Sequence, residues 1–158
     1  MFQIPVMLLL LFGVVQVARV FYVYHTLQTA LRGGAGLLAR STNVDYCAAE
    51  DLTIDDVRNF MVYGNLQGEG TPVVQGLTPD MIQILPERQA AGDTAVTQCS
   101  CGESETPGDS CGVSSGGRAP DFIVVNLPSG FPLRVPFPYV SFGTINLRVS
   151  VRMPVTGG

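Results

Sequence analysis

The N-terminal forty residues constrain the fold of this chain more than any other segment. No charged side chain occurs before Arg19, and residues 4–15 are an apolar run interrupted only by Pro5 and Gly13. Eighteen helical residues at a rise of ~1.5 Å each span about 27 Å, close to the ~30 Å hydrocarbon core of a bilayer. The segment therefore predicts one long helix that begins in lipid.

Beyond residue 15 the apolar residues become periodic instead of continuous. Arg19 is followed by a group of aromatic residues, the order expected where a helix leaves a membrane through a snorkelling cation and an aromatic belt. We expect residues 1–38, approximately, to form a hydrophobic stem that ends as an amphipathic helix. The residues that recur three or four apart, as on one helical face, are Val17, Val20, Phe21, Tyr24, Leu27 and Leu31.

The apolar run differs from a cleavable signal peptide. It lacks a basic region ahead of the run and a small-residue cleavage site after it, so we expect a retained anchor. Pro5 falls in the first turn, where a missing N–H costs little. Gly13 and Gln16 interrupt the run, as small and amide residues do at a helix–helix contact in lipid; the alternative for Gly13 is that it is merely tolerated there.

Three glycines, Gly33, Gly34 and Gly36, weaken the end of the stem by up to ~1 kcal/mol each. Either a close approach of another helix or a bend would compensate for that loss. They do not form a phosphate-binding loop, because no Lys-Ser/Thr follows and the glycines come after a helix instead of a strand.

Length and charge separate the stem from the rest of the chain. The 158 residues allow one stem, residues 1–40, and one extracellular head, residues 41–158. All 13 acidic residues lie from Asp45 onward, together with six of the nine arginines, and this gives the head a net charge of −7. An acidic head is unsuited to nucleic acid, whose phosphates require clustered cations.

The head has the pattern of a small α+β fold with an antiparallel sheet. A capping box from Thr53 to Asp56 predicts a short helix that buries Val57, Phe60 and Met61 and ends at Gly64. Prolines between residues 128 and 138 exclude a central strand and favour an edge strand or an extended loop. Residues 102–118 are polar and glycine-rich, as in a surface excursion. We expect strands at residues 81–85, 94–99, 121–126 and 144–153, the last with Ile145, Leu147, Val149, Val151 and Met153 facing inward.

Four cysteines in a head that follows an anchor indicate two disulfides, for which three pairings are possible. We favour Cys101–Cys111, which would close the polar excursion, and Cys47–Cys99, which would tie the stem exit to the sheet. Each would add roughly 3–4 kcal/mol in the chain-entropy model. Zinc is the alternative, but it requires paired C-x2–4-C motifs or histidines, and the spacing here fits it poorly.

The residues for catalysis or metal binding are not grouped in this sequence. His25 is the single histidine and lies on the stem, remote in sequence from any nucleophile it could activate. The acidic residues from Asp45 to Asp56 lack the spacing of a calcium-binding loop. We therefore expect no enzyme activity, no cofactor and no metal; a membrane-tethered hydrolase would need a catalytic set that is not apparent.

The N-terminal motifs resemble those of a known family. The apolar run with its early proline, then Arg-x-Phe-Tyr-x-Tyr and Ala-x-Arg-x-Gly-Ala, is similar to the TadE-like pilins of tight-adherence (Tad) pili and related type IV filament systems. Those pilins usually have a glutamate ahead of the apolar run, whereas no acid precedes Asp45 here. The head matches in layout alone: a Cys-x-Cys, a later Cys, a proline-rich bend and a final strand. The matching residues are Pro5, Leu8, Leu9, Leu10, Leu11, Phe12, Arg19, Phe21, Tyr22, Tyr24, Ala30, Arg32, Gly34 and Ala35.

The resemblance implies a structural, non-enzymatic pilin of an extracellular filament. Copies of the chain would be one another's partners, after a stage in the inner membrane that depends on a prepilin-type peptidase and an ATPase-driven pilus assembly machinery. The alternative is a single-pass membrane-anchored extracellular binding module, or a minor pseudopilin outside the filament shaft. The residues expected to mediate assembly are Pro5, Leu8, Leu9, Leu10, Leu11, Phe12, Gly13, Val17, Arg19, Phe21, Tyr24, Gly33, Gly34 and Gly36.

Overall fold

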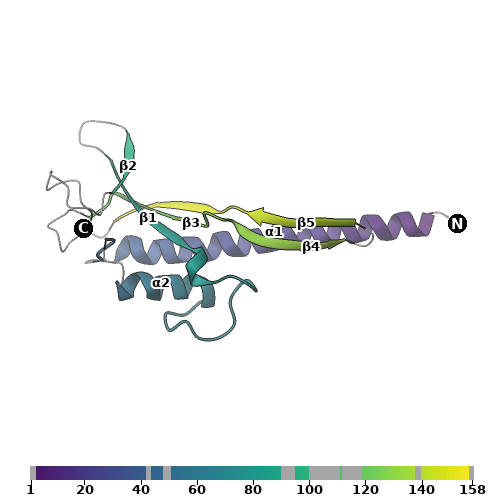
Figure 1. The fold of residues 1–158 in the computed structure, drawn as a ribbon, viewed down its shortest axis with the longest axis horizontal. Coiled ribbons are helices and arrows are strands. Elements are labelled where there is room, and N and C mark those ends of the chain that lie inside the picture. Colours follow the sequence, from purple (N-terminus) through teal and green to yellow (C-terminus); the bar gives the residue numbers. More distant parts are fainter. Residues whose placement is uncertain are drawn as a thin grey trace.

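The fold consists of one long helix and a small head packed on its C-terminal half (Figure 1). The computed structural model describes residues 3–41, 44–47, 51–89, 95–99, 111, 119–137 and 140–156. This arrangement confirms the expected α+β class. The elements in chain order are α1 (Gln3–Arg40), α2 (Leu52–Tyr63), a 3-10 turn η1 (Pro79–Met81), β1 (Gln83–Gln89), β2 (Val96–Gln98), β3 (Phe122–Asn126), β4 (Phe131–Phe137), β5 (Val140–Leu147) and β6 (Ser150–Pro154).

The C-terminal half of α1 is the central core element of the head. Leu27, Leu31, Ala35 and Leu38 are fully buried, at the three- and four-residue spacing of one helical face. That face packs against α2 on one side and against β3 and β6 on the other (Figure 1). The helix is therefore both a projecting stem and the support on which the head is built.

The inward face of α1 differs in part from the predicted stripe. Leu27 and Leu31 are buried as expected, but Val17, Phe21 and Tyr24 are exposed. The reason is that the four-stranded sheet and α2 pack against only the later turns of α1, so the earlier turns lie beyond them.

Four antiparallel strands form the main sheet, in the order β2-β1-β3-β6. Its centre is β3, in which Ile123 and Val125 are fully buried at alternate positions. On the other face, the Arg152 Nε lies 3.0 Å from the Glu87 carboxylate, and the guanidinium carbon lies 4.2 Å from the centre of the Phe122 ring. The strand predicted at residues 121–126 is confirmed as β3, and that at 94–99 as the shorter β2.

Strands β3 and β6, together with β4 and β5 between them in the sequence, form one long hairpin. The β3–β6 pair belongs to the main sheet, and the β4–β5 pair forms a separate two-stranded sheet. The β3–β6 ladder ends at Asn126 and Ser150, and the β4–β5 ladder begins at Phe131 and Leu147. Between them the Leu127 N–H donates a 3.1 Å hydrogen bond to the carbonyl of Val149. The hairpin thus has an inner part in the main sheet and an outer part, β4–β5, that extends beside α1 (Figure 1).

This change of sheet corrects the single strand expected at residues 144–153. The segment divides into β5 and β6, and Ile145, expected to face inward, is 42% exposed, whereas Val149 and Val151 are buried as expected. Alternation of apolar residues does not reveal where a ladder is interrupted: Ile145 has the same parity as Val149 and Val151 but lies in β5, which belongs to the separate two-stranded sheet.

Two prolines of the segment 128–138 lie in an edge strand, where a residue without an N–H group is tolerated. Pro132 and Pro136 lie within β4, and both strands of the two-stranded β4–β5 sheet are edge strands. The edge strand anticipated between residues 128 and 138 is therefore present. The strand predicted at residues 81–85 begins later, at Gln83, because Pro79 opens a 3-10 turn that continues to Met81.

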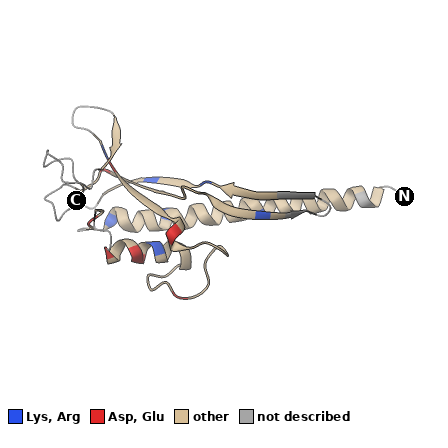
Figure 2. Ribbon diagram, viewed as in Figure 1, with Lys and Arg blue, Asp and Glu red and all other residues tan. Residues whose placement is uncertain are grey.

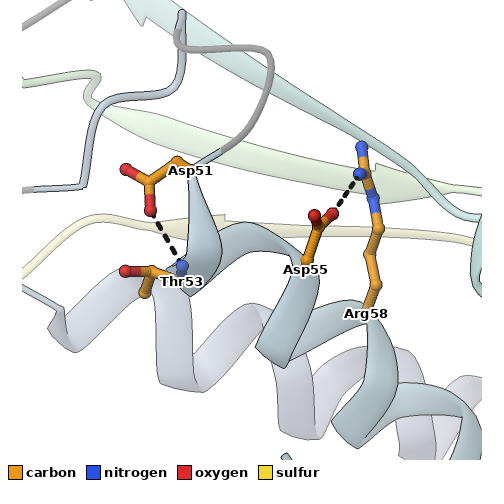
Figure 3. A network of polar contacts seen from close by, with 4 residues as sticks. All are labelled: Asp51, Thr53, Asp55 and Arg58. Atoms are coloured by element: carbon orange, nitrogen blue, oxygen red, sulfur yellow. Dashed lines mark hydrogen bonds and ion pairs between the residues drawn. The ribbon is translucent and has the colours of Figure 1, made fainter.

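The N-cap of helix α2 lies two residues before the first residue of the predicted capping box. Asp51, not Thr53, is the N-cap: its backbone is extended and its carboxylate accepts a 2.8 Å hydrogen bond from the Thr53 N–H (Figure 3). An Asp55–Arg58 ion pair of 2.9 Å stabilises the first turns. The helix ends at Gly64 as predicted, with a φ of 75° that favours glycine.

The buried face of α2 matches the prediction at most positions. Val57 and Met61 are buried, and Phe60 is half-buried. Ile54 and Val62 complete the face that packs toward α1.

The described disulfide joins Cys99 to Cys111, with a Cα–Cα distance of 5.7 Å. Both favoured pairings, Cys101–Cys111 and Cys47–Cys99, are therefore wrong. Cys99 and Cys101 are two residues apart, so loop length does not distinguish them as partners of Cys111. Cys47 is also disulfide-bonded, while Cys101 and the rest of the excursion at residues 102–118, apart from Cys111, lie outside the described residues.

Candidate membrane and assembly surface

The N-terminal half of α1 exposes apolar side chains in every direction. Met7, Leu8, Leu9, Leu10 and Leu11 are consecutive and each is 47–74% exposed, so this part of the helix has no buried face. An 18-residue window of the helix has a mean hydropathy of 2.2 and only 6% of it is buried. A core helix of a soluble domain would be mostly covered, so this segment fits a membrane or a partner.

The expected interface residues lie on the exposed surface at the head side of this apolar segment. Arg19 is exposed, and Phe21 and Tyr22 are 66% and 71% exposed. Figure 2 shows acidic residues on α2 and beside it, and none on the projecting part of α1. The charge pattern places the head in water and the projecting helix in an apolar medium.

Gln16 is an exception on the projecting helix, because it is only 8% exposed. Its neighbours Val14, Val15 and Val17 are 54–70% exposed, so one narrow face of α1 is covered at this point. Gln16 is thus covered within the chain.

Gly13 differs from Gln16 in that the chain itself does not occupy the space beside it. A Cβ placed there would meet no described atom within 4 Å. The glycine is not required by the fold of a single chain, and its surface is available to a neighbouring helix.

The glycines near the end of α1 serve contacts within the chain. A Cβ at Gly34 would overlap the side chain of Met61, and one at Gly33 would lie 3.4 Å from the Phe60 ring. Helix α1 continues without a break to Arg40. Close helix approach, not a bend, therefore explains these two glycines, and the approaching helix is α2.

A shallow groove of about 420 Å³ lies between α1 and the loop after α2. It is lined mainly by apolar surface from Tyr22, His25, Ala30 and Val73 and by two threonines. The hydroxyls of those threonines, Thr26 and Thr29, donate to α1 carbonyls at 2.8 and 2.9 Å. Its lining offers His25 no cysteine, serine or carboxylate to activate.

Among the described residues, His, Cys, Asp and Glu do not form a group of three or more that could hold a metal ion. Asp45 and Asp51 come close together, but their contacts are structural. The Asp51 carboxylate accepts hydrogen bonds from the Asp45 and Thr53 N–H groups at 2.9 and 2.8 Å.

Two ionisable groups at the start of α2 are shifted by these contacts. Burial alone would raise the pKa of Asp51, but the N–H groups of Asp45 and Thr53 stabilise the charged form and lower that pKa below 3.8. Burial, and then the nearby Asp51 charge, raises the pKa of Tyr46 to about 12. The Tyr46 hydroxyl donates to the Leu38 carbonyl at 3.4 Å and so ties this loop to α1.

Together these features define a class of protein with one apolar helix of membrane-spanning length and an α+β head packed on its C-terminal half. The model of the TadE-like protein family matches residues 4–35. This range includes the apolar run and the residues from Arg19 to Tyr24, so the chain is similar to TadE-like proteins over its N-terminal segment, as its motifs indicate. Comparison with curated proteins and with solved structures gave no match.

The pairing of β4 with β5 in a sheet of their own is the feature that sequence reasoning missed. Its signal was present as an interval without charge between Arg134 and Arg148, next to a proline-rich segment. The prolines predicted an edge strand. The uncharged interval is the additional signal that would have indicated a pair of strands.

Proposed function

We propose that this chain is a structural pilin subunit of a Tad-type, type IV-like extracellular filament and that copies polymerise through α1. One observation supports this most directly: the segment matched by the TadE-like family, residues 4–35, begins with an apolar run whose side chains lie exposed. The expected assembly residues Leu8, Leu10, Leu11 and Val17 are each more than half exposed.

The energetics of assembly follow from this exposure. Exposed apolar surface costs about 25 cal/mol per Å² in water, so α1 needs either lipid or other helices around it. Before assembly the inner membrane supplies lipid, and in the filament neighbouring copies of α1 replace it. Because both surroundings are apolar, packing at small residues such as Gly13 decides how closely the copies approach.

The rest of the proposed role concerns partners and location. The head forms the outer shell of the filament on the cell surface, and the subunit is non-enzymatic. A prepilin-type peptidase and an ATPase-driven assembly machinery act on the membrane-anchored precursor, as in the filament systems that the N-terminal motifs resemble.

Cysteine cross-linking on cells, combined with electron microscopy of sheared surface material, tests this proposal. Leu10→Cys and Val14→Cys place thiols on the exposed part of α1, whose native residues are 67% and 70% exposed. Val73→Cys, at a 42% exposed position of the head, is the matched control. The native cysteines of the described residues are bonded and do not interfere.

We expect filaments that contain the chain, with cross-linked multimers from the two α1 variants and few from the control. A surface preparation without filaments, in which all three variants remain monomeric, would refute polymerisation. That result would favour the single-pass binding module or a pseudopilin outside the shaft.

A further inference from the structure

The groove between α1 and the loop after α2 has two sides that are held in place by the fold. One side is the surface of α1 from Tyr22 to Ala30, and the other is Val73 of the loop. The Val73 N–H donates a 2.7 Å hydrogen bond to the carbonyl of Val62 in α2, and the next residue, Val74, is buried in the core of the head. The loop is thereby fixed, so the groove exists before any partner binds.

The groove presents an uncharged and mainly apolar surface. Its six lining residues include no Asp, Glu, Lys or Arg. The hydroxyls of Thr26 and Thr29 donate to the carbonyls of Tyr22 and His25, so these donors are already in use. Methyl groups and the Tyr22 ring therefore remain for a partner, whose own surface should be apolar and uncharged.

The position of the groove along α1 distinguishes a protein partner from lipid. Tyr22 follows Arg19 by three residues and Ala30 follows it by eleven, which places the groove about 5–17 Å beyond Arg19 along the helix axis. Because the cation and the aromatic residues after it mark the point where α1 leaves the apolar medium, most of the groove lies on the water side of that boundary. Lipid chains do not cover this surface, and a protein segment can.

The dimensions of the groove suit a helix. Its lining extends over eight residues of α1, about 12 Å or two helical turns. A helix bound in such a groove inserts apolar side chains spaced by three, four and seven residues. Met7, Leu10, Leu11 and Val14 of this same chain have that spacing, and each is 65–74% exposed.

We propose that the groove binds residues 7–14 of α1 from a second copy of the chain. This inference rests on polymerisation in the proposed function and names the surface of one copy that receives the stem of the next. The occupant is a second copy because the chain carries both matching surfaces: an uncharged groove two turns long, and an uncharged helix whose apolar side chains are exposed at the required spacing.

This contact requires a displacement between copies that have the same orientation. Leu10 of one copy reaches the level of Thr26 of the other only after an offset of 16 residues along the axis, about 24 Å. Each copy then uses its groove toward one neighbour and its apolar segment toward another, so the contact is heterologous. Because the displacement accumulates along the axis, the contact does not close into a ring and produces an open helical array.

Cysteine pairing between two differently tagged copies tests the contact. One copy carries Leu10→Cys and the other carries Val73→Cys; both are expressed in the same cells, sheared surface material is oxidised, and mass spectrometry identifies the joined peptides. Leu11→Cys is a second probe on α1, so that the rotation of the bound helix does not decide the result. Leu66→Cys is the matched control for Val73→Cys, because Leu66 lies in the same loop and is 43% exposed against 42%, but does not line the groove.

We expect the peptide of residue 73 to be joined to that of residue 10 or 11 at least several-fold more often than the peptide of residue 66. If filaments form but residue 73 is joined no more often than residue 66 with both α1 probes, the groove is not the docking surface and the inference is wrong, although polymerisation stands. If no filaments form and Leu10→Cys copies are not joined to one another either, polymerisation fails and the inference fails with it.

Discussion

Met61 of α2 lies directly against Gly34 of α1, so closely that a Cβ at Gly34 would overlap the methionine side chain. Met61 is fully buried, and the contact holds α2 against the helix that also supports the sheet. Two helices approach this closely only where one of them lacks a side chain.

Gly34→Ala should therefore destabilise the head despite the better helix propensity of alanine. We expect a loss of about 1–3 kcal/mol in the free energy of unfolding, the usual cost of overpacking, measured by denaturant titration in detergent. Gly36→Ala is the matched control, because its Cβ would lie 4.0 Å from the Met153 sulfur, an ordinary contact. Equal stability of the two variants would contradict this account of the helix contact.

The Cys99–Cys111 bond predicts a defined peptide map. Digestion without reduction should release a fragment in which the peptides of these two cysteines are joined. Replacing both by serine should lower the free energy of unfolding by roughly 2–4 kcal/mol, because the bond closes a short loop. A fragment joining Cys101 to Cys111 would show that the described connectivity is wrong.

Asp51 should make the stability of the head depend on acidic pH. The folded-state pKa is lowered below 3.8, so the charged cap contributes fully above that value and its contribution is lost as pH falls through the folded pKa. Asp51→Ala should cost about 1 kcal/mol at neutral pH. Asp51→Asn, which keeps a capping oxygen, should retain most of the stability but lose this pH dependence, as unfolding curves at several pH values would show.

Tyr46 should make stability depend on pH at the alkaline end. Its pKa rises from 10.0 to about 12 on folding, so its contribution is complete below pH 10 and is lost as pH rises toward 12. Ultraviolet absorbance during alkaline titration should show a tyrosine ionisation step near pH 12. That late step should be absent in Tyr46→Phe, and its persistence there would assign it to another tyrosine.

The sequence alone predicted the features that depend on local pattern. The continuous apolar residues from Leu8 to Phe12 indicated an exposed stem, and the apolar alternation around Ile123 and Val125 indicated a buried strand. The glycine at position 64 marked the end of α2. Each of these signals involves neighbours within a few residues, where backbone geometry fixes which side chains share a face.

Features that depend on residues far apart in the sequence could not be predicted from local patterns. Cys99 and Cys101 are equivalent partners for Cys111 by spacing, and the structure pairs Cys111 with Cys99, which directly follows β2. Asp51 and Thr53 are both good caps, and the Asp45 N–H that also bonds Asp51 favours the former.

The interruption between the β3–β6 and β4–β5 ladders has a mechanical consequence. Residues 127–130 and 148–149 belong to neither ladder, and the Leu127–Val149 hydrogen bond connects the two parts. Rotation about these short connections would alter the tilt of the outer strands without breaking a single pair in the main sheet. The tilt of the β4–β5 hairpin relative to the main sheet is therefore set by two short chain segments and the hydrogen bond between them.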